Sequence, residues 1–216
     1  MCLKIKKESG LAIQMITEAG IIGKIGLNSQ GVGCTLNAIK AKGVSYSKLP
    51  CHLALRTVME SSSRTAAIET LEKAGVASAC HILVADVTGG TGLECSSHDI
   101  VQLPMNREGI VTHTNHYVLS HVKEVVEAED WLPDTRLRLD KIGELLNAAK
   151  EEKPSAEVVE KLLKDETEFE NGAAICRNGG LGLLTLFSIV MDLGGRKAKV
   201  HMGRPSKPDE TLILSP

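Results

Sequence analysis

The stretch GLAIQMITEAGIIGKIGLNSQGVGCTLNAI, residues 10–39, alternates short apolar or β-branched runs with turn residues. Such runs have the length and composition of β-strands, and the polar and glycine residues between them are typical of tight turns. Strands are therefore expected over residues 12–16, 21–27 and 32–39. Because the intervening turns are short, the strands should form consecutive hairpins, and this part of the chain should be an antiparallel sheet.

Pairs of helices interrupt the strands that follow. Helices are expected over residues 50–61, 62–75, 134–150 and 154–164. Pro50 and Gly75 are typical of the start and the end of the first pair. Further strands are expected over residues 80–87, 92–97, 99–104, 109–118, 184–193, 197–203 and 211–215. This order predicts one α+β domain over residues 1–216, a layered sandwich of mainly antiparallel sheets covered by helices.

Composition argues against several classes of partner. Aromatic residues make up 2% of the chain and the net charge is −2, so neither stacking platforms nor a basic face for nucleic acid is expected. No apolar run approaches the roughly 18–20 residues that cross a bilayer, so no membrane partner is expected. Without a secretory leader or a C-terminal peroxisomal tripeptide, we expect a cytoplasmic location. The six cysteines form no C-x-x-C pair and are expected to be reduced thiols.

The segment VTHTNHYVLSH, residues 111–121, holds three of the seven histidines. On the expected strand, alternation would place His113 and Asn115 on one face and His116 on the other, so the two histidines could not share a metal ion. No metal and no cofactor is therefore expected. Asn115 remains of interest, because a carboxamide held by a sheet can donate to an oxyanion. The alternative is a structural asparagine.

The motifs GLECS, VTHTNH, LPDTRLR, ICR and MGRPSKPDET follow one another in a recognisable order and spacing. From about residue 11 to about residue 212, the chain resembles the fungal acyl-coenzyme A:isopenicillin N (6-aminopenicillanate) acyltransferase family, which consists of cysteine N-terminal-nucleophile hydrolases. The resemblance implies the αββα sandwich of that family. It also implies a cysteine thiolate that takes an acyl group from an amide or thioester and passes it to water or an amine.

The resemblance assigns roles to three residues and reveals two departures. It implies that Asn115 is the oxyanion donor, that Ser96 matches a serine implicated in precursor cleavage, and that Arg138 has an anchoring role. The first departure is that the family's nucleophilic cysteine and the aspartate after it have no counterpart, which implies that the first one or two strands are missing. The second is Leu181-Gly182, which replaces a Ser-Arg pair and argues against the penicillin nucleus as substrate.

Cys2 is the one thiol that raises an alternative. Removal of Met1 would expose its α-amine, the arrangement that the family uses. Its place in the chain corresponds to a different strand, however, so an edge-strand or disordered thiol is the favoured interpretation.

These observations lead to one favoured hypothesis about function. It is an acyltransferase or amidohydrolase that uses an acyl-cysteine intermediate and is inactive as an isolated chain. The expected partners are a small-molecule acyl donor (an acyl-CoA or an amide), an amine or water acceptor, and a complementary chain or oligomer that covers an exposed sheet edge. The alternatives are a non-catalytic paralogue that serves as a binding or regulatory subunit, and a metal-dependent hydrolase built on the histidines.

Overall fold

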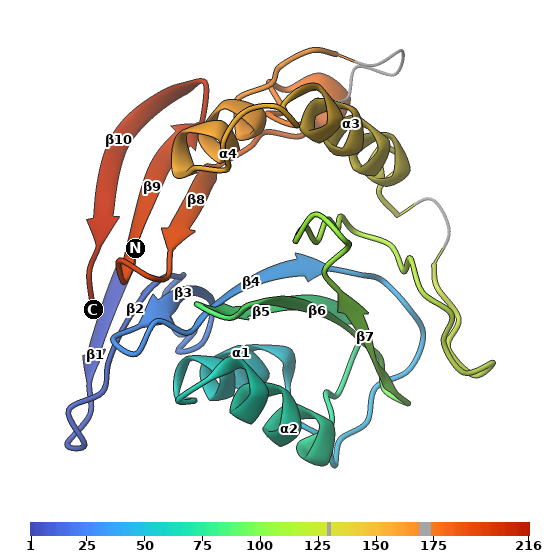
Figure 1. The fold of residues 1–216 in the computed structure, drawn as a ribbon. Coiled ribbons are helices and arrows are strands. Elements are labelled where there is room, and N and C mark those ends of the chain that lie inside the picture. Colours follow the sequence, from blue (N-terminus) through green and yellow to red (C-terminus); the bar gives the residue numbers. More distant parts are fainter. Residues whose placement is uncertain (129–130, 169–173) are drawn as a thin grey trace. The chain divides into compact units, whose positions relative to one another are not determined.

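The computed structural model describes residues 1–128, 131–168 and 174–216 (Figure 1). The chain divides into two compact units. The first unit comprises Met1–Trp131, Leu193–Lys197 and Ser215–Pro216, and the second comprises Leu132–Asp192 and Ala198–Leu214. Each unit is described by itself. The expectation of one domain over residues 1–216 stays a prediction.

The first unit contains a seven-stranded antiparallel sheet in which the strands lie in sequence order. The strands are β1 (Cys2–Lys6), β2 (Ala12–Ile16), β3 (Ile25–Asn28), β4 (Gly33–Ala38), β5 (Cys80–Asp86), β6 (Gly89–Cys95) and β7 (Ile100–Pro104). The consecutive hairpins expected over residues 10–39 are confirmed as β2, β3 and β4, each paired antiparallel with the next.

Two helices, α1 (Cys51–Met59) and α2 (Arg64–Ala74), cover one face of this sheet (Figure 1). The Oγ of Ser63 accepts a hydrogen bond from the N–H of Ala66 and so caps the start of α2. Gly75 ends the helix with a φ of 68°, a conformation that favours glycine. The helix pair predicted from the sequence is confirmed at both of these boundaries.

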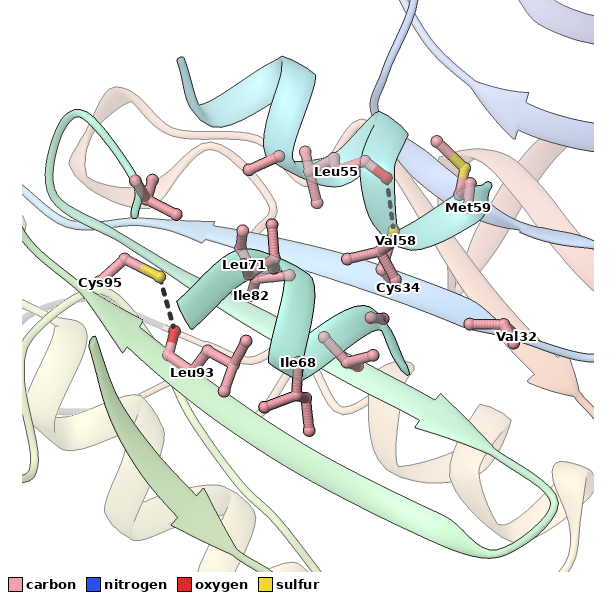
Figure 2. Packing of buried hydrophobic residues seen from close by; sticks show 14 of the residues in the cluster. Val32, Cys34, Leu55, Val58, Met59, Ile68, Leu71, Ile82, Leu93 and Cys95 are labelled. Atoms are coloured by element: carbon pink, nitrogen blue, oxygen red, sulfur yellow. Dashed lines mark hydrogen bonds between the residues drawn. The ribbon is translucent and has the colours of Figure 1, made fainter. Parts of the chain in front are cut away.

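The core lies between these helices and the sheet (Figure 2). The buried side chains that form it include Val32, Cys34, Leu55, Val58, Met59, Ile68, Leu71, Ile82, Leu93 and Cys95. They are apolar and contain no aromatic ring, as the composition requires. Burial of this apolar surface is the main force that holds the helices on the sheet.

The opposite face of the sheet carries a row of polar side chains. Asn37 of β4 is paired with His81 of β5, and His81 is paired with Glu94 of β6. Since side chains alternate along a strand, these three residues point away from α1 and α2, whereas their neighbours Ile82 and Leu93 point into the core. His81 and Glu94 are nonetheless buried, at 1% and 0% exposure.

The loop that follows β7 covers this polar face of the sheet and is called the covering loop. The sequence prediction for this loop is wrong. Residues 109–118, expected as a strand, form no strand. The N–H groups of Val118 and Leu119 donate to the side chain of Glu94 and not to a neighbouring strand. The strand propensity of the Thr, Val and Tyr residues is thus overridden by bonds to a distant carboxylate.

The second unit combines two helices with a three-stranded antiparallel sheet. The helices are α3 (Thr135–Ala148) and α4 (Ala156–Leu163), followed by a short 3-10 helix at Gly180–Gly182. The strands are β8 (Phe187–Asp192), β9 (Lys197–Arg204) and β10 (Lys207–Leu214), in the order β10-β9-β8. The helices and strands predicted for this region are confirmed. Among the described residues, no helix is long and apolar enough to cross a membrane.

Asn28 links the β3–β4 turn to the end of α1. Its side chain is fully buried. Its Oδ1 accepts from the N–H groups of Gln30 and Val32, each at 3.0 Å. Its Nδ2 donates to the carbonyls of Met59 at 3.0 Å and Ser61 at 2.8 Å. One side chain therefore satisfies two N–H groups of the turn and two carbonyls of the helix end.

The Asn28→Ala substitution should lower the free energy of unfolding by about 2–4 kcal/mol, because it leaves buried backbone groups without partners. Urea denaturation measures the loss. The matched control is Gln30→Ala in the same turn, whose exposed side chain should change stability by less than about 0.5 kcal/mol. Equal stabilities of the two variants would contradict this role for Asn28.

Candidate active site

Asn115 lies on the covering loop and contacts the end of β4. Its Nδ2 donates to the carbonyl oxygen of Ala38 at 2.9 Å. The strand predicted for this segment does not form, and Asn115 is held by a backbone carbonyl of β4. This bond uses an N–H of the primary amide and holds the carboxamide at the end of β4.

Glu94 anchors the loop that carries Asn115. Its Oε1 accepts from Nε2 of His113 at 2.8 Å and from the N–H of Val118 at 2.6 Å. Its Oε2 accepts from the N–H of Leu119 at 3.0 Å and from Nε2 of His121 at 3.2 Å. Burial alone would raise the pKa of this carboxyl, but the bonds from His113 and the two backbone N–H groups hold its pKa below the usual value. The carboxylate is therefore ionised.

His113 and His121 both bond to this carboxylate. The Nδ1 of His113 lies 2.9 Å from the carbonyl oxygen of Thr114. The Nδ1 of His121 lies 2.8 Å from Oδ1 of Asp99. Each ring thus links Glu94 to a second oxygen, the carbonyl of Thr114 or the carboxylate of Asp99.

The third histidine of the motif, His116, is directed at Thr114. It is buried, and its Nδ1 lies 3.3 Å from Oγ1 of Thr114. Across residues 1–128, 131–168 and 174–216, no group of three or more His, Cys, Asp or Glu side chains is placed to hold a metal ion. The nitrogens of His113 and His121 are directed at oxygen acceptors of the protein.

A fourth histidine, His81, supports the cluster from the sheet. Its ring stacks on that of His113, with centroids 3.7 Å apart and an interplanar angle of 8°. Burial lowers the pKa of His81 to about 2, helped by the nearby charge of His113, so its ring is neutral. Its Nδ1 lies 3.0 Å from Oδ1 of Asn37. Gly92 makes room for this ring, because a Cβ there would lie 2.5 Å from Nε2 of His81.

Ser96 closes the turn between β6 and β7. Its hydroxyl lies 2.5 Å from Oδ1 of Asp99 and accepts from the N–H groups of His98 and Asp99, each at 3.0 Å. These bonds fix Asp99 where it meets His121. The role in precursor cleavage that the resemblance implies for Ser96 stays a prediction.

The buried cysteines are poorly suited to act as nucleophiles. Burial raises the pKa of Cys34 to about 12. A contact with Cys80 and burial together raise the pKa of Cys51 well above its usual value. Thiols in such surroundings stay protonated, and the thiolate is the reactive form. Cys80, Cys95 and Cys176 are buried as well.

Cys2 is exposed, but it lies far from Asn115. It belongs to β1, an edge strand, so the favoured interpretation of this thiol agrees with the structure. β1 is three strands away from β4, to which Asn115 is bonded. Since neighbouring strands lie about 4.8 Å apart, Cys2 is separated from Ala38 by about 14 Å across the sheet. Cys2 and Asn115 therefore cannot contact the same carbonyl group in this arrangement.

In the second unit, the LPDTRLR and ICR motifs meet at a buried carboxylate. Asp134 is fully buried. Its Oδ1 and Oδ2 accept from Nη2 and Nε of Arg177 at 2.6 and 2.8 Å, and Oδ2 also accepts from Nε of Arg138 at 3.0 Å. Arg138 is thus bonded to a buried carboxylate, the kind of contact expected of an anchoring residue. Leu181-Gly182 lies in the 3-10 helix that follows this segment.

The Asp134→Ala substitution should lower the free energy of unfolding by about 2–4 kcal/mol, because it leaves two guanidinium groups without their shared carboxylate. The expected loss is smaller than that for a fully buried ion pair, because the side chain of Arg177 keeps 18% exposure. The control is Lys161→Ala, which removes a surface pair with Glu152 and should cost less than about 1 kcal/mol. Similar costs for the two variants would contradict the cluster.

The effect of Asp134 should also depend on pH. Burial alone would raise the pKa of Asp134. The hydrogen bonds and charges of Arg177 and Arg138 lower this pKa by more, so in the folded state it lies below the ordinary 3.8. A lowered folded pKa contributes stability that is present in full above the unfolded pKa and is lost as the pH falls through the folded pKa. The stability gap between wild type and Asp134→Ala should therefore shrink below about pH 3.8. A gap that stays constant in acid would contradict this.

The sequence matches a described family of enzymes. Residues 1–207 match the family described as acyl-coenzyme A:6-aminopenicillanic acid acyl-transferase. Over 207 residues, the chain is 39% identical to the acyl-coenzyme A:6-aminopenicillanic-acid-acyltransferase 40 kDa form of Emericella nidulans, with 94% of this chain and 56% of that protein covered. The chain thus spans little more than half the length of this relative.

Several solved structures have a similar fold. Penicillin V acylase from Agrobacterium tumefaciens superposes with a TM-score of 0.64 at 12% identity, over 95% of this chain and 69% of that one. A variant of conjugated bile acid hydrolase from Clostridium perfringens gives 0.60 at 15% identity, over 95% and 76%. An N-acylethanolamine-hydrolyzing acid amidase ortholog from Caenorhabditis elegans gives 0.59 at 16%, over 99% and 86%. The predicted N-terminal-nucleophile hydrolase fold is confirmed.

Proposed function

The chain belongs to the acyl-coenzyme A:6-aminopenicillanic acid acyl-transferase family, and we propose that it serves as an acyltransferase or amidohydrolase that works through an acyl-cysteine intermediate. The observation that carries this proposal is the placement of Asn115. Its carboxamide lies at the end of a sheet strand, on a loop that a buried carboxylate holds in place. A fixed amide donor of this kind is what a developing oxyanion requires.

The proposed reaction begins when a cysteine thiolate attacks the carbonyl carbon of a thioester or amide. A C–S bond forms, the carbonyl electrons move to oxygen, and an N–H of Asn115 donates to the resulting oxyanion. Collapse re-forms the carbonyl and expels the thiol or amine, which takes the proton that the nucleophile gave up. Water or an amine then attacks the carbonyl carbon of the acyl-cysteine and loses a proton, and the C–S bond breaks to release the acyl product and the cysteine thiolate. No cofactor is needed for these steps.

We place the nucleophilic cysteine on a further segment of polypeptide that pairs with residues 1–216. This segment is either continuous with them or a separate chain. All six cysteines lie in the described residues; four are buried, Cys51 has a raised pKa, and Cys2 is three strands from β4. The partners are therefore an acyl-CoA or amide donor, an amine or water acceptor, and a complementary chain or oligomer. Leu181-Gly182 disfavours the penicillin nucleus as acceptor. The relatives named above are enzymes, which favours catalysis over a binding subunit.

The test uses the protein expressed from its complete coding sequence and assayed with acyl-CoA thioesters and simple amides. The Asn115→Ala variant should lose about 10²–10³-fold in kcat/KM, the usual effect of removing one oxyanion donor. Asn147→Ala, on the exposed surface of α3, is the matched asparagine control and should keep full activity.

Two results would contradict the proposal. One is unchanged turnover of Asn115→Ala. The other is the absence of any acyl-cysteine when the wild-type protein is mixed with the substrates and analysed by mass spectrometry.

A further inference from the structure

We propose that Glu94 is the positioning residue for Asn115, and that its carboxylate, bonded to His113, His121 and two backbone N–H groups, holds the covering loop so that the amide stays on the carbonyl of Ala38. The catalytic meaning of this placement rests on the proposed function. The placement itself does not, and it can be measured on the chain without any substrate.

The contacts of Glu94 lie on both sides of Asn115. His113 precedes Asn115 by two positions, and Val118 and Leu119 follow it by three and four. Fixing the backbone of one residue costs roughly 1–2 kcal/mol of conformational entropy, so a loop without strand or helix bonds needs such anchors to stay ordered. A shift of about 1 Å in a catalytic group can cost about 10²-fold in rate.

The bonds to Glu94 require an acceptor at both of its oxygens. Each oxygen is bonded to one backbone N–H and one histidine ring nitrogen, and all four groups lie within residues 113–121. A glutamine has the same shape but only one acceptor oxygen. Whichever way its amide is turned, its NH₂ group would face a backbone N–H of the loop, that of Val118 or that of Leu119. A carboxylate is therefore required, and the isosteric substitution should release the loop.

The rings bonded to Glu94 are themselves held in place. His113 faces Glu94 and is stacked on the neutral His81. His121 faces both Glu94 and Asp99, and the ring of Tyr117 lies against it, with centroids 4.1 Å apart. The buried carboxylate of Glu94 is thus fully hydrogen bonded, which avoids the cost of an unpaired buried charge.

The experiment measures the side-chain amide of Asn115 by ¹⁵N NMR on the chain, with the signal identified by its absence in Asn115→Ala. In the wild type, the hydrogen bonded to Ala38 should exchange slowly with solvent. Glu94→Gln should raise its exchange rate at least about 10-fold. The matched control is Glu72→Gln on α2, an exposed carboxylate bonded to Gln102, which should leave the rate unchanged.

A second variant covers the case in which Glu94→Gln fails to fold. His121→Ala removes the bonds of the ring to Glu94 and Asp99 and leaves three hydrogen bonds on Glu94, so a smaller increase in the exchange of the Asn115 amide is expected. Unchanged exchange in His121→Ala, or in a folded Glu94→Gln, would overturn the proposal.

The pH dependence of the same signal gives an independent readout. Because the folded pKa of Glu94 lies below the ordinary 4.5, protection of the Asn115 amide should be complete above about pH 4.5 and should be lost as the pH falls further. Glu94→Gln should not show this transition. A wild-type signal that stays protected at acid pH while the fold persists would contradict the positioning role of Glu94.

Activity of the complete protein separates this proposal from the proposed function. Glu94→Gln should lower kcat by about 10–10²-fold with little change in KM. If Asn115→Ala is fully active while Glu94→Gln still releases the amide, the proposed function fails and the positioning stands. If Asn115→Ala is inactive while Glu94→Gln keeps kcat, the positioning fails alone.

Discussion

The buried carboxylate of Glu94 determines how one face of the first unit is built. It is fully buried on a strand, and a charge in that place is tolerated only when it is fully hydrogen bonded. The loop after β7 supplies its partners: two imidazole rings and two backbone N–H groups. The loop is therefore ordered by a side chain of the sheet. The position of Asn115 follows from that order, because it lies between the points of attachment.

The motifs that identify the family acquire a physical explanation in each unit. In the first unit, GLECS supplies Glu94 and Ser96, and VTHTNH supplies His113 and the loop that Glu94 binds. In the second unit, LPDTRLR and ICR meet as Asp134 with two arginines. In both cases, residues far apart in sequence gather around one buried carboxylate. The apolar residues between α1, α2 and the sheet stabilise the fold, and the carboxylates fix the segments that apolar packing does not hold.

Local sequence signals were sufficient for most of the regular elements, although β1 (Cys2–Lys6) was not predicted. The hairpins of β2 to β4 followed from turn residues, and the end of α2 followed from Gly75. The covering loop was predicted wrongly, since its bonds go to Glu94, about twenty residues earlier, and propensity does not register such contacts. The meeting of His113 and His121 at Glu94 was not predicted, because it depends on the path of this loop. A lone acidic residue among the apolar residues of β6 was the one local sign of the cluster. Asn115 was found through the family resemblance, but the carbonyl that holds it was visible only in the structure.

The central claim is that the amide held between Glu94 and Ala38 is the donor that stabilises the oxyanion. The most direct test is a crystal structure of the complete protein with an aldehyde that adds to the nucleophilic cysteine and mimics the tetrahedral intermediate. The account predicts that the hemithioacetal oxygen lies about 2.7–3.1 Å from Nδ2 of Asn115, with the bond from Nδ2 to Ala38 retained. An oxygen bound by other donors, with Nδ2 of Asn115 more than about 4 Å away, would contradict it.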